Sequence, residues 1–215
     1  MILQEEREQV VEYGMKMVET GLTVGTFGNL SVYNPEKNLM AISPSGMDYF
    51  STKPEDVVVL TPDGEHVDGK RKPSSEYDMH RIFYQRRPGI NAVVHTHSTF
   101  ATTLACLNWS IEPLHYLVAY SGKSVPCTKY VQFGTYELGE SALEAMGNGY
   151  ACLLGNHGLV TCGNDMNYAF DVAQQIEFVS ELYYRAKAVG APVLLNDEQI
   201  SVVLEQFKTY ASRKK

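Results

Sequence analysis

The sequence has few of the features that mark a secreted, membrane-spanning or nucleic-acid-binding protein. Its four cysteines lack CxxC spacing and lie in or beside apolar segments, so we interpret them as thiols of a reducing compartment. No apolar run approaches the ~18 residues that a membrane helix needs, and the N-terminus lacks the pattern of a signal peptide. A net charge of −7 without a basic stripe argues against nucleic acid as a partner. We therefore expect a cytoplasmic protein.

Repeats, low-complexity tracts and linkers are also missing, which favours one sizeable core. The 215 residues are 44% hydrophobic and 20% charged, with 17 glycines and 9 prolines scattered along the chain. A globular domain of this length buries roughly 70% of the surface that its unfolded chain exposes. Such a core needs neither a disulfide nor a metal to be stable, so we expect any bound metal to be functional. We expect residues 1–215 to form a single domain.

Hydrophobic periodicity predicts helices that flank a set of hairpins. Strands are predicted in "NLSVYN", "NLMAI", "DVVVL" and "INAVVHTH", and on both sides of the turn in "YACLLGNHGLVTCG". Ser74 or Ser75 is the expected N-cap of the second helix. This pattern is typical of a three-layer α/β/α domain with a central, mostly antiparallel sheet. The predicted helices span residues 3–20, 77–86, 98–108, 166–189 and 196–210.

Two histidines, His95 and His97, end the apolar strand "INAVVHTH". Residues i and i+2 of a strand point to the same face, with Cα atoms about 6.5 Å apart. Two imidazoles at this spacing can bind one ion, act as a pair of bases, or satisfy each other as a polar pair in the core. The pair alone leaves these alternatives open.

Further ligands would favour a metal, and two candidates stand out. Glu76 begins a predicted helix, and His157 lies between two glycines in a tight turn. Three histidines with one carboxylate form a typical zinc ligand set. Each candidate also has an ordinary interpretation, as a helix-terminal acid and as a turn residue. His80 is a rival ligand, whereas His66 is expected at the surface.

Three turns rich in small hydrogen-bond donors form a second pattern. Glycine allows the backbone to approach an anion closely, and the serine pair precedes a helix N-terminus, where phosphate binds readily. Each turn alone is common, and spacing does not show whether the three meet. The candidate phosphate-binding residues are Gly28, Asn29, Ser45, Gly46, Ser74 and Ser75.

The ordered motifs carry a resemblance that covers nearly the whole chain. "GTFGNLS", "ISPSG", "KPSSE", "AVVHTHS", "HYLVA", "VQFGTYELG", "LLGNHGLV" and "VVLEQFKTY" follow the pattern of zinc-dependent class II sugar-phosphate aldolases. The sequence is most similar to the L-fuculose-1-phosphate aldolase branch of that family. The wider superfamily also contains L-ribulose-5-phosphate 4-epimerase. The combination of motifs is specific, although no single one is.

The resemblance implies roles for the candidate residues. One Zn²⁺ per subunit would be held by Glu76, His95, His97 and His157, and the substrate phosphate would lie among the donor turns. Tyr116 would reach a neighbouring subunit's site and protonate the aldehyde oxygen, and Tyr210 would close over the substrate from a mobile tail. The assembly implied is a homotetramer with active sites at subunit interfaces.

The implied reaction is the reversible cleavage of a ketose 1-phosphate, of the L-fuculose 1-phosphate type, to dihydroxyacetone phosphate and an aldehyde of the lactaldehyde type. Zinc would act as a Lewis acid, and Glu76 as the acid and base at C3.

Phe27 is bulkier than the residue that relatives often carry there, which leaves the identity of the substrate open. The alternatives are an aldolase for 5-deoxyribulose 1-phosphate or a related deoxyketose 1-phosphate, a methylthioribulose-1-phosphate dehydratase, and a pentulose-phosphate 4-epimerase. Epimerases usually carry Asp at position 76. A scaffold protein without activity is disfavoured, because the metal, acid–base and phosphate residues are all present.

Overall fold

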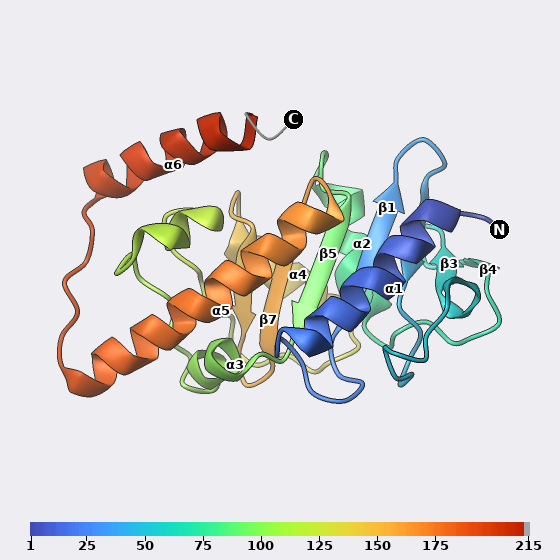
Figure 1. Ribbon diagram of the computed structural model, residues 1–215, viewed down its shortest axis with the longest axis horizontal. Coiled ribbons are helices and arrows are strands. Elements are labelled where there is room, and N and C mark those ends of the chain that lie inside the picture. Colours follow the sequence, from blue (N-terminus) through green and yellow to red (C-terminus); the bar gives the residue numbers. More distant parts are fainter. Residues whose placement is uncertain (213–215) are drawn as a thin grey trace.

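A seven-stranded sheet forms the middle layer of the protein, as the computed structural model shows (Figure 1). The structure describes residues 1–212, with side chains to residue 207. The strand order is β4-β3-β2-β1-β5-β7-β6, and every neighbouring pair is antiparallel. The strands are β1 (Asn29–Asn34), β2 (Leu39–Ile42), β3 (Val58–Leu60), β4 (His66–Asp68), β5 (Ala92–Thr96), β6 (Ala151–Leu154) and β7 (Gly158–Gly163).

Helices cover both faces of this sheet, which confirms the three-layer α/β/α fold. The helices α1 (Gln4–Glu19), α3 (Thr99–Cys106) and α5 (Met166–Val189) pack on one face, and α2 (Tyr77–Arg86) and α4 (Tyr136–Met146) on the other (Figure 1).

The central strand β5 shows why both faces are covered. Ala92 and Val94 belong to the core beneath α1 and α5, whereas Val93 belongs to the core beneath α2 and α4. All three side chains are fully buried, as expected for a strand with no solvent-facing side. The strand therefore reads as a continuous apolar run that ends in the two histidines.

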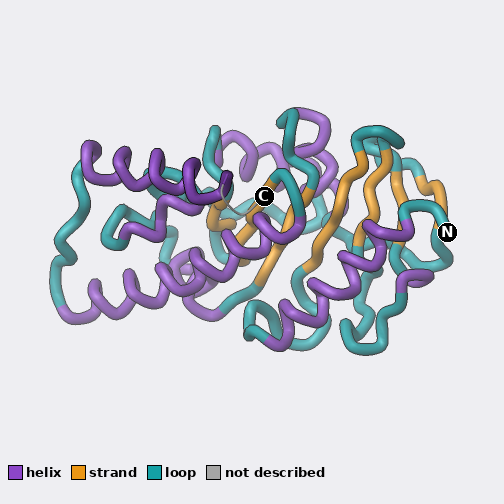
Figure 2. The backbone as a smooth tube through the Cα atoms, turned by 45° about the horizontal axis from the view of Figure 1, so that its top comes forward, coloured by secondary structure: helices purple, strands orange, loops and turns teal. Residues whose placement is uncertain are grey.

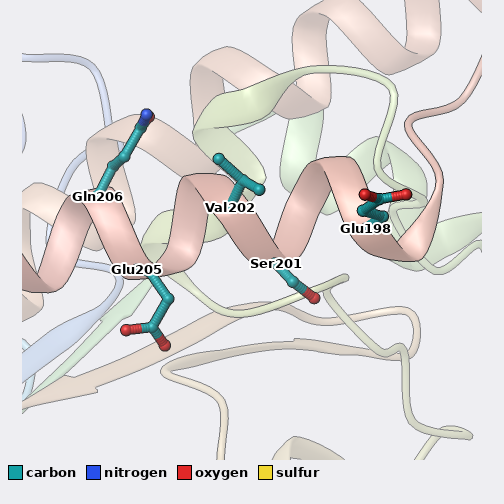
Figure 3. Close-up of a pocket in the computed structure, with 5 residues that line it drawn as sticks. All are labelled: Glu198, Ser201, Val202, Glu205 and Gln206. Atoms are coloured by element: carbon teal, nitrogen blue, oxygen red, sulfur yellow. The ribbon is translucent and has the colours of Figure 1, made fainter.

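The last helix, α6 (Asp197–Ser212), lies over the short 3-10 helix η2 (Tyr116–Tyr120), and a long loop joins it to α5 (Figure 2). Leu195 in that loop donates to the carbonyl of Pro113, and the ring of Phe207 lies 4.9 Å from that of Tyr120. A shallow hollow on α6 is lined by side chains of that one helix alone (Figure 3). They project apart from one another, so no reactive cluster forms there.

Two features of the helices differ from the sequence prediction. Helix α2 has the predicted bounds, but its N-cap is Glu76 and neither Ser74 nor Ser75. Ser74 directly follows the isolated bridge between Pro44 and Pro73, and its N–H donates to the carbonyl of Ser43. Helix α4 was not predicted, because Gly139 interrupts its pattern. That glycine lets α4 approach α2 closely: an added Cβ would lie 3.0 Å from the Cα of Met79.

The other predicted helices and strands are confirmed to within a few residues, and a further 3-10 turn, η1 (Pro54–Asp56), was not foreseen. No helix in the described part of the chain is long and apolar enough to cross a membrane.

Candidate active site

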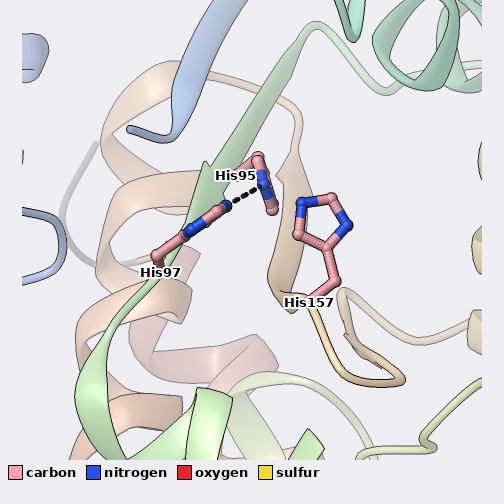
Figure 4. Close-up of side chains that lie close together, drawn as sticks. All are labelled: His95, His97 and His157. Carbon is pink, nitrogen blue, oxygen red and sulfur yellow. Dashed lines mark hydrogen bonds between the residues drawn. The ribbon is translucent and has the colours of Figure 1, made fainter. Parts of the chain in front are cut away.

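Three histidines meet at one end of the central strands (Figure 4). His95 is the last residue but one of β5, His97 directly follows this strand, and His157 lies in the turn between β6 and β7. Their ligating nitrogen atoms all lie within 4.8 Å of one another, and the two Nε2 atoms of His95 and His97 are 2.9 Å apart. The pairing of β5 with β7 thus brings His157 next to two histidines that lie about sixty residues earlier in the sequence. The structure brings together all three histidines that the spacing proposed.

The carboxylate of Glu76 completes the cluster from the start of α2. Its Oε2 lies 3.3 Å from His95 Nε2, and its Oε1 lies 3.4 Å from His157 Nε2. The side chain is only 8% exposed. Three imidazoles and one buried carboxylate therefore surround a single small volume.

Close backbone approach makes this convergence possible. A Cβ on Gly158 would lie 2.4 Å from the carbonyl oxygen of Thr96. It would lie 3.3 Å from the imidazole rings of His95 and His97. Only glycine fits at this position, because real Cβ atoms do not come so near to backbone oxygen. Asn156 has a φ of 55°, a conformation that asparagine tolerates better than most residues. The turn that carries His157 is therefore shaped by its two neighbours.

The imidazoles are held in the neutral form that binds metals. Burial lowers the pKa of His95 well below its ordinary value of 6.5, and the neighbouring histidines lower it further. Burial also lowers the pKa values of His97 and His157. His95 Nδ1 donates to the carbonyl of Leu159 at 2.9 Å, so the lone pair of Nε2 faces the cluster.

The residues fit a divalent cation. Glu76 Oε1 and His157 Nδ1 are buried and have no hydrogen-bond partner in the described part of the chain. A buried carboxylate oxygen without a donor is costly, and a cation shared with three neutral imidazoles would satisfy it. Nitrogen and carboxylate ligands in this number are those that zinc takes in proteins. The cluster is thus a candidate metal site.

The donor-rich turns meet beside this cluster, in a pocket of about 450 Å³. All six predicted phosphate-binding residues line it, together with Glu76, His97 and His157. The question that spacing left open is therefore answered by the fold. The remaining lining residues are Thr26, Phe27, Pro44, Tyr130, Phe133 and Asn156.

Two of these turns form one unit. Ser45 N–H donates to the carbonyl of Lys72 at 2.9 Å, and Ser74 N–H donates to the carbonyl of Ser43 at 3.0 Å. Since the bridge between Pro44 and Pro73 lies between these bonds, both serine turns are fixed relative to each other. Their free donors consequently line the same side of the pocket.

The two tyrosines of the sequence prediction are not brought to this pocket within one chain. Tyr116 begins η2, is 49% exposed, and contacts His115 and Phe207, with ring centroids 4.7 Å and 6.3 Å away. The side chain of Tyr210 lies outside the described residues.

The remaining histidines are placed away from the cluster. His80, the rival ligand, is fully buried and hydrogen-bonded by both ring nitrogens to Ser31 and Asn29, so it is no metal ligand here. His66 is exposed on β4, as predicted, and His115 accepts from the N–H of Leu117 at the start of η2.

Aromatic residues at the pocket mouth were missed. Phe133 lies in the motif "VQFGTYELG", which was given no residue role, and Tyr130 directly precedes that motif. The available signal was two aromatic residues close together in one loop, because binding residues are disproportionately found on loops.

Comparison with known proteins defines the class. Residues 8–184 match the family described as Class II Aldolase and Adducin N-terminal domain. The chain belongs to this class II aldolase family, and it is an enzyme of the metal-dependent aldehyde-lyase class.

Among its relatives, the 5-deoxy-D-ribulose 1-phosphate aldolase of Bacillus thuringiensis serovar kurstaki is 49% identical over 213 residues, covering 99% of this chain and 100% of the relative. The L-fuculose phosphate aldolase of Escherichia coli K12 is 41% identical over 207 residues, covering 95% of each. A solved structure of an L-fuculose 1-phosphate aldolase superposes with a TM-score of 0.94 at 44% identity, over 97% of this chain and 98% of that one.

Proposed function

We propose that this protein is a zinc-dependent aldolase that reversibly cleaves a ketose 1-phosphate to dihydroxyacetone phosphate and a small aldehyde. The observation that carries the proposal is the joining of two sites: the histidine cluster and the six donors line the same pocket. A metal site beside a phosphate-binding surface suits a substrate with a carbonyl close to a phosphate. A homotetramer in the cytoplasm, with the whole chain as one domain, remains part of the prediction.

Glu76, His95, His97 and His157 would hold the zinc. Bound there, it would supply a Lewis acid for the substrate carbonyl. The lowered pKa values of the three histidines favour their neutral forms, and His95 is oriented by its hydrogen bond to the carbonyl of Leu159.

Neutral donors would bind the phosphate. The described lining of the pocket contains neither lysine nor arginine. Hydroxyl groups of Ser45, Ser74 and Ser75, the amide of Asn29, and the backbone at Gly28 and Gly46 would therefore replace water around the anion. The N-terminus of α2 begins directly behind Ser75, and its partial positive charge favours the phosphate further.

Glu76 would move the proton at C3. In the cleavage direction the C4 hydroxyl would return its proton to Tyr116, the bond between C3 and C4 would break with its electron pair left on C3, and Glu76 would deliver a proton to C3. In condensation Glu76 removes that proton again. The support is its position, since it reaches the cluster and the phosphate pocket at once.

Tyr116 would donate to the aldehyde oxygen from a neighbouring subunit. What supports this is its place on η2, half exposed and outside the pocket of its own chain. Tyr210 would close over the substrate from the end of α6.

The identity of the aldehyde depends on the pocket mouth. Phe27, Tyr130 and Phe133 are 63%, 62% and 60% exposed, and the ring of Phe27 stacks on His97 with centroids 5.7 Å apart. Three rings favour an apolar end of the substrate, as in L-fuculose 1-phosphate with its terminal methyl group. The bulk of Phe27 and the 49% identity to a 5-deoxy-D-ribulose 1-phosphate aldolase favour the shorter 5-deoxyribulose 1-phosphate as a second candidate.

A cleavage assay on a panel of ketose phosphates tests the proposal. Dihydroxyacetone phosphate is detected by a coupled reaction, with and without prior removal of metal by a chelator. We expect cleavage of L-fuculose 1-phosphate or 5-deoxyribulose 1-phosphate that is lost with the chelator and restored by zinc. Activity that survives complete metal removal contradicts the zinc mechanism, and loss of water or a change at C4 without cleavage indicates a dehydratase or epimerase.

A further inference from the structure

A chain of buried hydrogen bonds leads from Glu76 into the core beneath α2. Asn29 Nδ2 donates to Glu76 Oε2 at 2.9 Å, and the Oδ1 atom of the same amide lies 2.5 Å from His80 Nε2. His80 Nδ1 lies 2.7 Å from Ser31 Oγ, which in turn lies 2.5 Å from the hydroxyl of Tyr84. All five side chains are at least nine-tenths buried, and His80 and Ser31 are fully so.

Which group donates in each of these hydrogen bonds can be worked out starting from the carboxylate of Glu76. An ionised carboxylate only accepts hydrogen bonds, so the Asn29 group that faces Glu76 is its NH₂. The amide oxygen then faces His80, and the hydrogen between them must be carried by His80 Nε2.

The remaining links follow from the neutrality of His80. Burial lowers the pKa of His80 to about 3, so its ring carries a single proton at pH 7. Since that proton is on Nε2, Nδ1 accepts from the Ser31 hydroxyl. The Tyr84 hydroxyl is left to donate to Ser31, whose Oγ and carbonyl oxygen are both within 3.0 Å. Every donor in the chain therefore points toward Glu76.

We propose that His80 is a positioning residue for Glu76, because its Nε2–H tautomer holds the Asn29 amide with its NH₂ group toward the carboxylate. With the proton on Nδ1, the amide would turn and present its oxygen to Glu76, and two acceptors would repel each other. This hydrogen-bond network binds only the Oε2 atom of Glu76. The Oε1 atom, which faces His157, has no hydrogen bond from the described residues. This inference rests on the proposed role of Glu76.

Two substitutions of His80 separate positioning from packing. His80→Gln keeps an N–H donor that reaches Asn29, whereas His80→Leu keeps a similar volume and removes the donor. We expect His80→Leu to lower kcat roughly 10- to 100-fold with little change in KM, and His80→Gln to recover most of that loss. A role in packing alone predicts the reverse order, because leucine leaves fewer unpaired polar groups in a core than glutamine does. That reverse order, or equal rates in both variants, overturns the proposal.

A second pair keeps the test decisive if His80→Leu does not fold. Ser31→Ala removes the hydroxyl that donates to His80 Nδ1 and so supports the Nε2–H tautomer, and Ser180→Ala removes a buried hydroxyl in α5 that donates to the carbonyl of Ile176. We expect a lower kcat for Ser31→Ala than for Ser180→Ala when both have the same thermal midpoint. Equal kcat values contradict the proposal.

Two readouts do not depend on activity. Neutron diffraction from deuterated wild-type crystals should show deuterium on His80 Nε2 and the Asn29 ND₂ group facing Glu76, and deuterium on Nδ1 would overturn the inference. Zinc affinity, measured by chelator competition, should fall more for Ser31→Ala than for Ser180→Ala. If the wild-type protein cleaves no ketose phosphate, the proposed function fails, and the hydrogen positions still decide the inference.

Discussion

The two sides of the pocket differ in how firmly the fold holds them. The side at the candidate metal site includes strongly buried groups: His95 is fully buried, and Asn29 and Glu76 are 5% and 6% exposed. Another part of the lining consists of rings that are more than half exposed, at Phe27, Tyr130 and Phe133, the first of which stacks on His97. Under the proposed function, the groups that need a fixed geometry would be held by buried hydrogen bonds, while the groups that would contact the variable end of a substrate lie on loops. Changes on the first side should alter rate, and changes on the second should alter preference.

The largest effect is expected on the buried side. Glu76→Gln keeps the shape and the hydrogen bond from Asn29, or its equivalent, and removes the base. We expect kcat to fall by roughly 10² to 10⁴ while the circular dichroism spectrum stays unchanged. Glu144→Gln, at an exposed position on α4, is the control and should keep full activity. A near-normal rate for Glu76→Gln would exclude Glu76 as the base.

Acid should destabilise the metal-free protein through its buried histidines. The pKa of His80 is lowered from 6.5 to about 3 by burial, so the unfolded chain binds one more proton than the folded one between these values. Stability therefore falls as the pH drops below 6.5, by about 1.4 kcal/mol per pH unit for this histidine. Urea unfolding at pH 7 and pH 5 measures the slope. His80→Gln should show a shallower slope, and an identical slope would mean that His80 does not resist protonation.

A smaller effect is expected where a phosphate donor is removed. Ser75→Ala deletes an exposed hydroxyl from the pocket while leaving the bridge at Pro73 intact. A hydrogen bond to a charged group contributes about 1.5 to 3 kcal/mol, so KM for the ketose phosphate should rise roughly 10-fold or more with kcat little changed. Ser141→Ala on α4 serves as the control. An unchanged KM would place the phosphate elsewhere.

The smallest change in rate, and the clearest change in preference, is expected at Phe27. Phe27→Ala enlarges the exposed side of the pocket and removes the ring stacked on His97. The ratio of kcat/KM for L-fuculose 1-phosphate to that for 5-deoxyribulose 1-phosphate should rise by up to about 10-fold, because the longer aldehyde gains room. Tyr77→Ala, outside the pocket, is not expected to shift this ratio. An equal loss for both substrates would show that Phe27 supports His97 and does not select the aldehyde.

Much of the buried side was predictable from the sequence, because strand geometry and motif spacing are local rules. Residues two apart in a strand share a face, and this placed His95 beside His97. The meeting of the donor turns could not be derived in this way. It depends on the bridge between Pro44 and Pro73, which joins segments about thirty residues apart.

The errors have physical causes of a similar kind. His80 was weighed as a ligand because it lies one helical turn beyond Glu76. That turn instead directs it to Ser31 and Asn29 on β1, a contact that no local pattern reveals. Helix α4 escaped prediction because Gly139, unfavourable in an isolated helix, is required by the close contact with α2.

The pairing of β1 with β5 has a consequence for the length of any substrate. Asn29 lies directly opposite His95 in this ladder, so the strand that follows the donor turn at Gly28 and the strand that carries candidate metal ligands share one hydrogen-bonded register. A slip by one residue would send Asn29 to the other face of the sheet. For the proposed reaction, the strand register would fix the distance between the phosphate-binding donors and the carbonyl-binding metal site. Extra carbons are therefore accommodated at the aldehyde end alone.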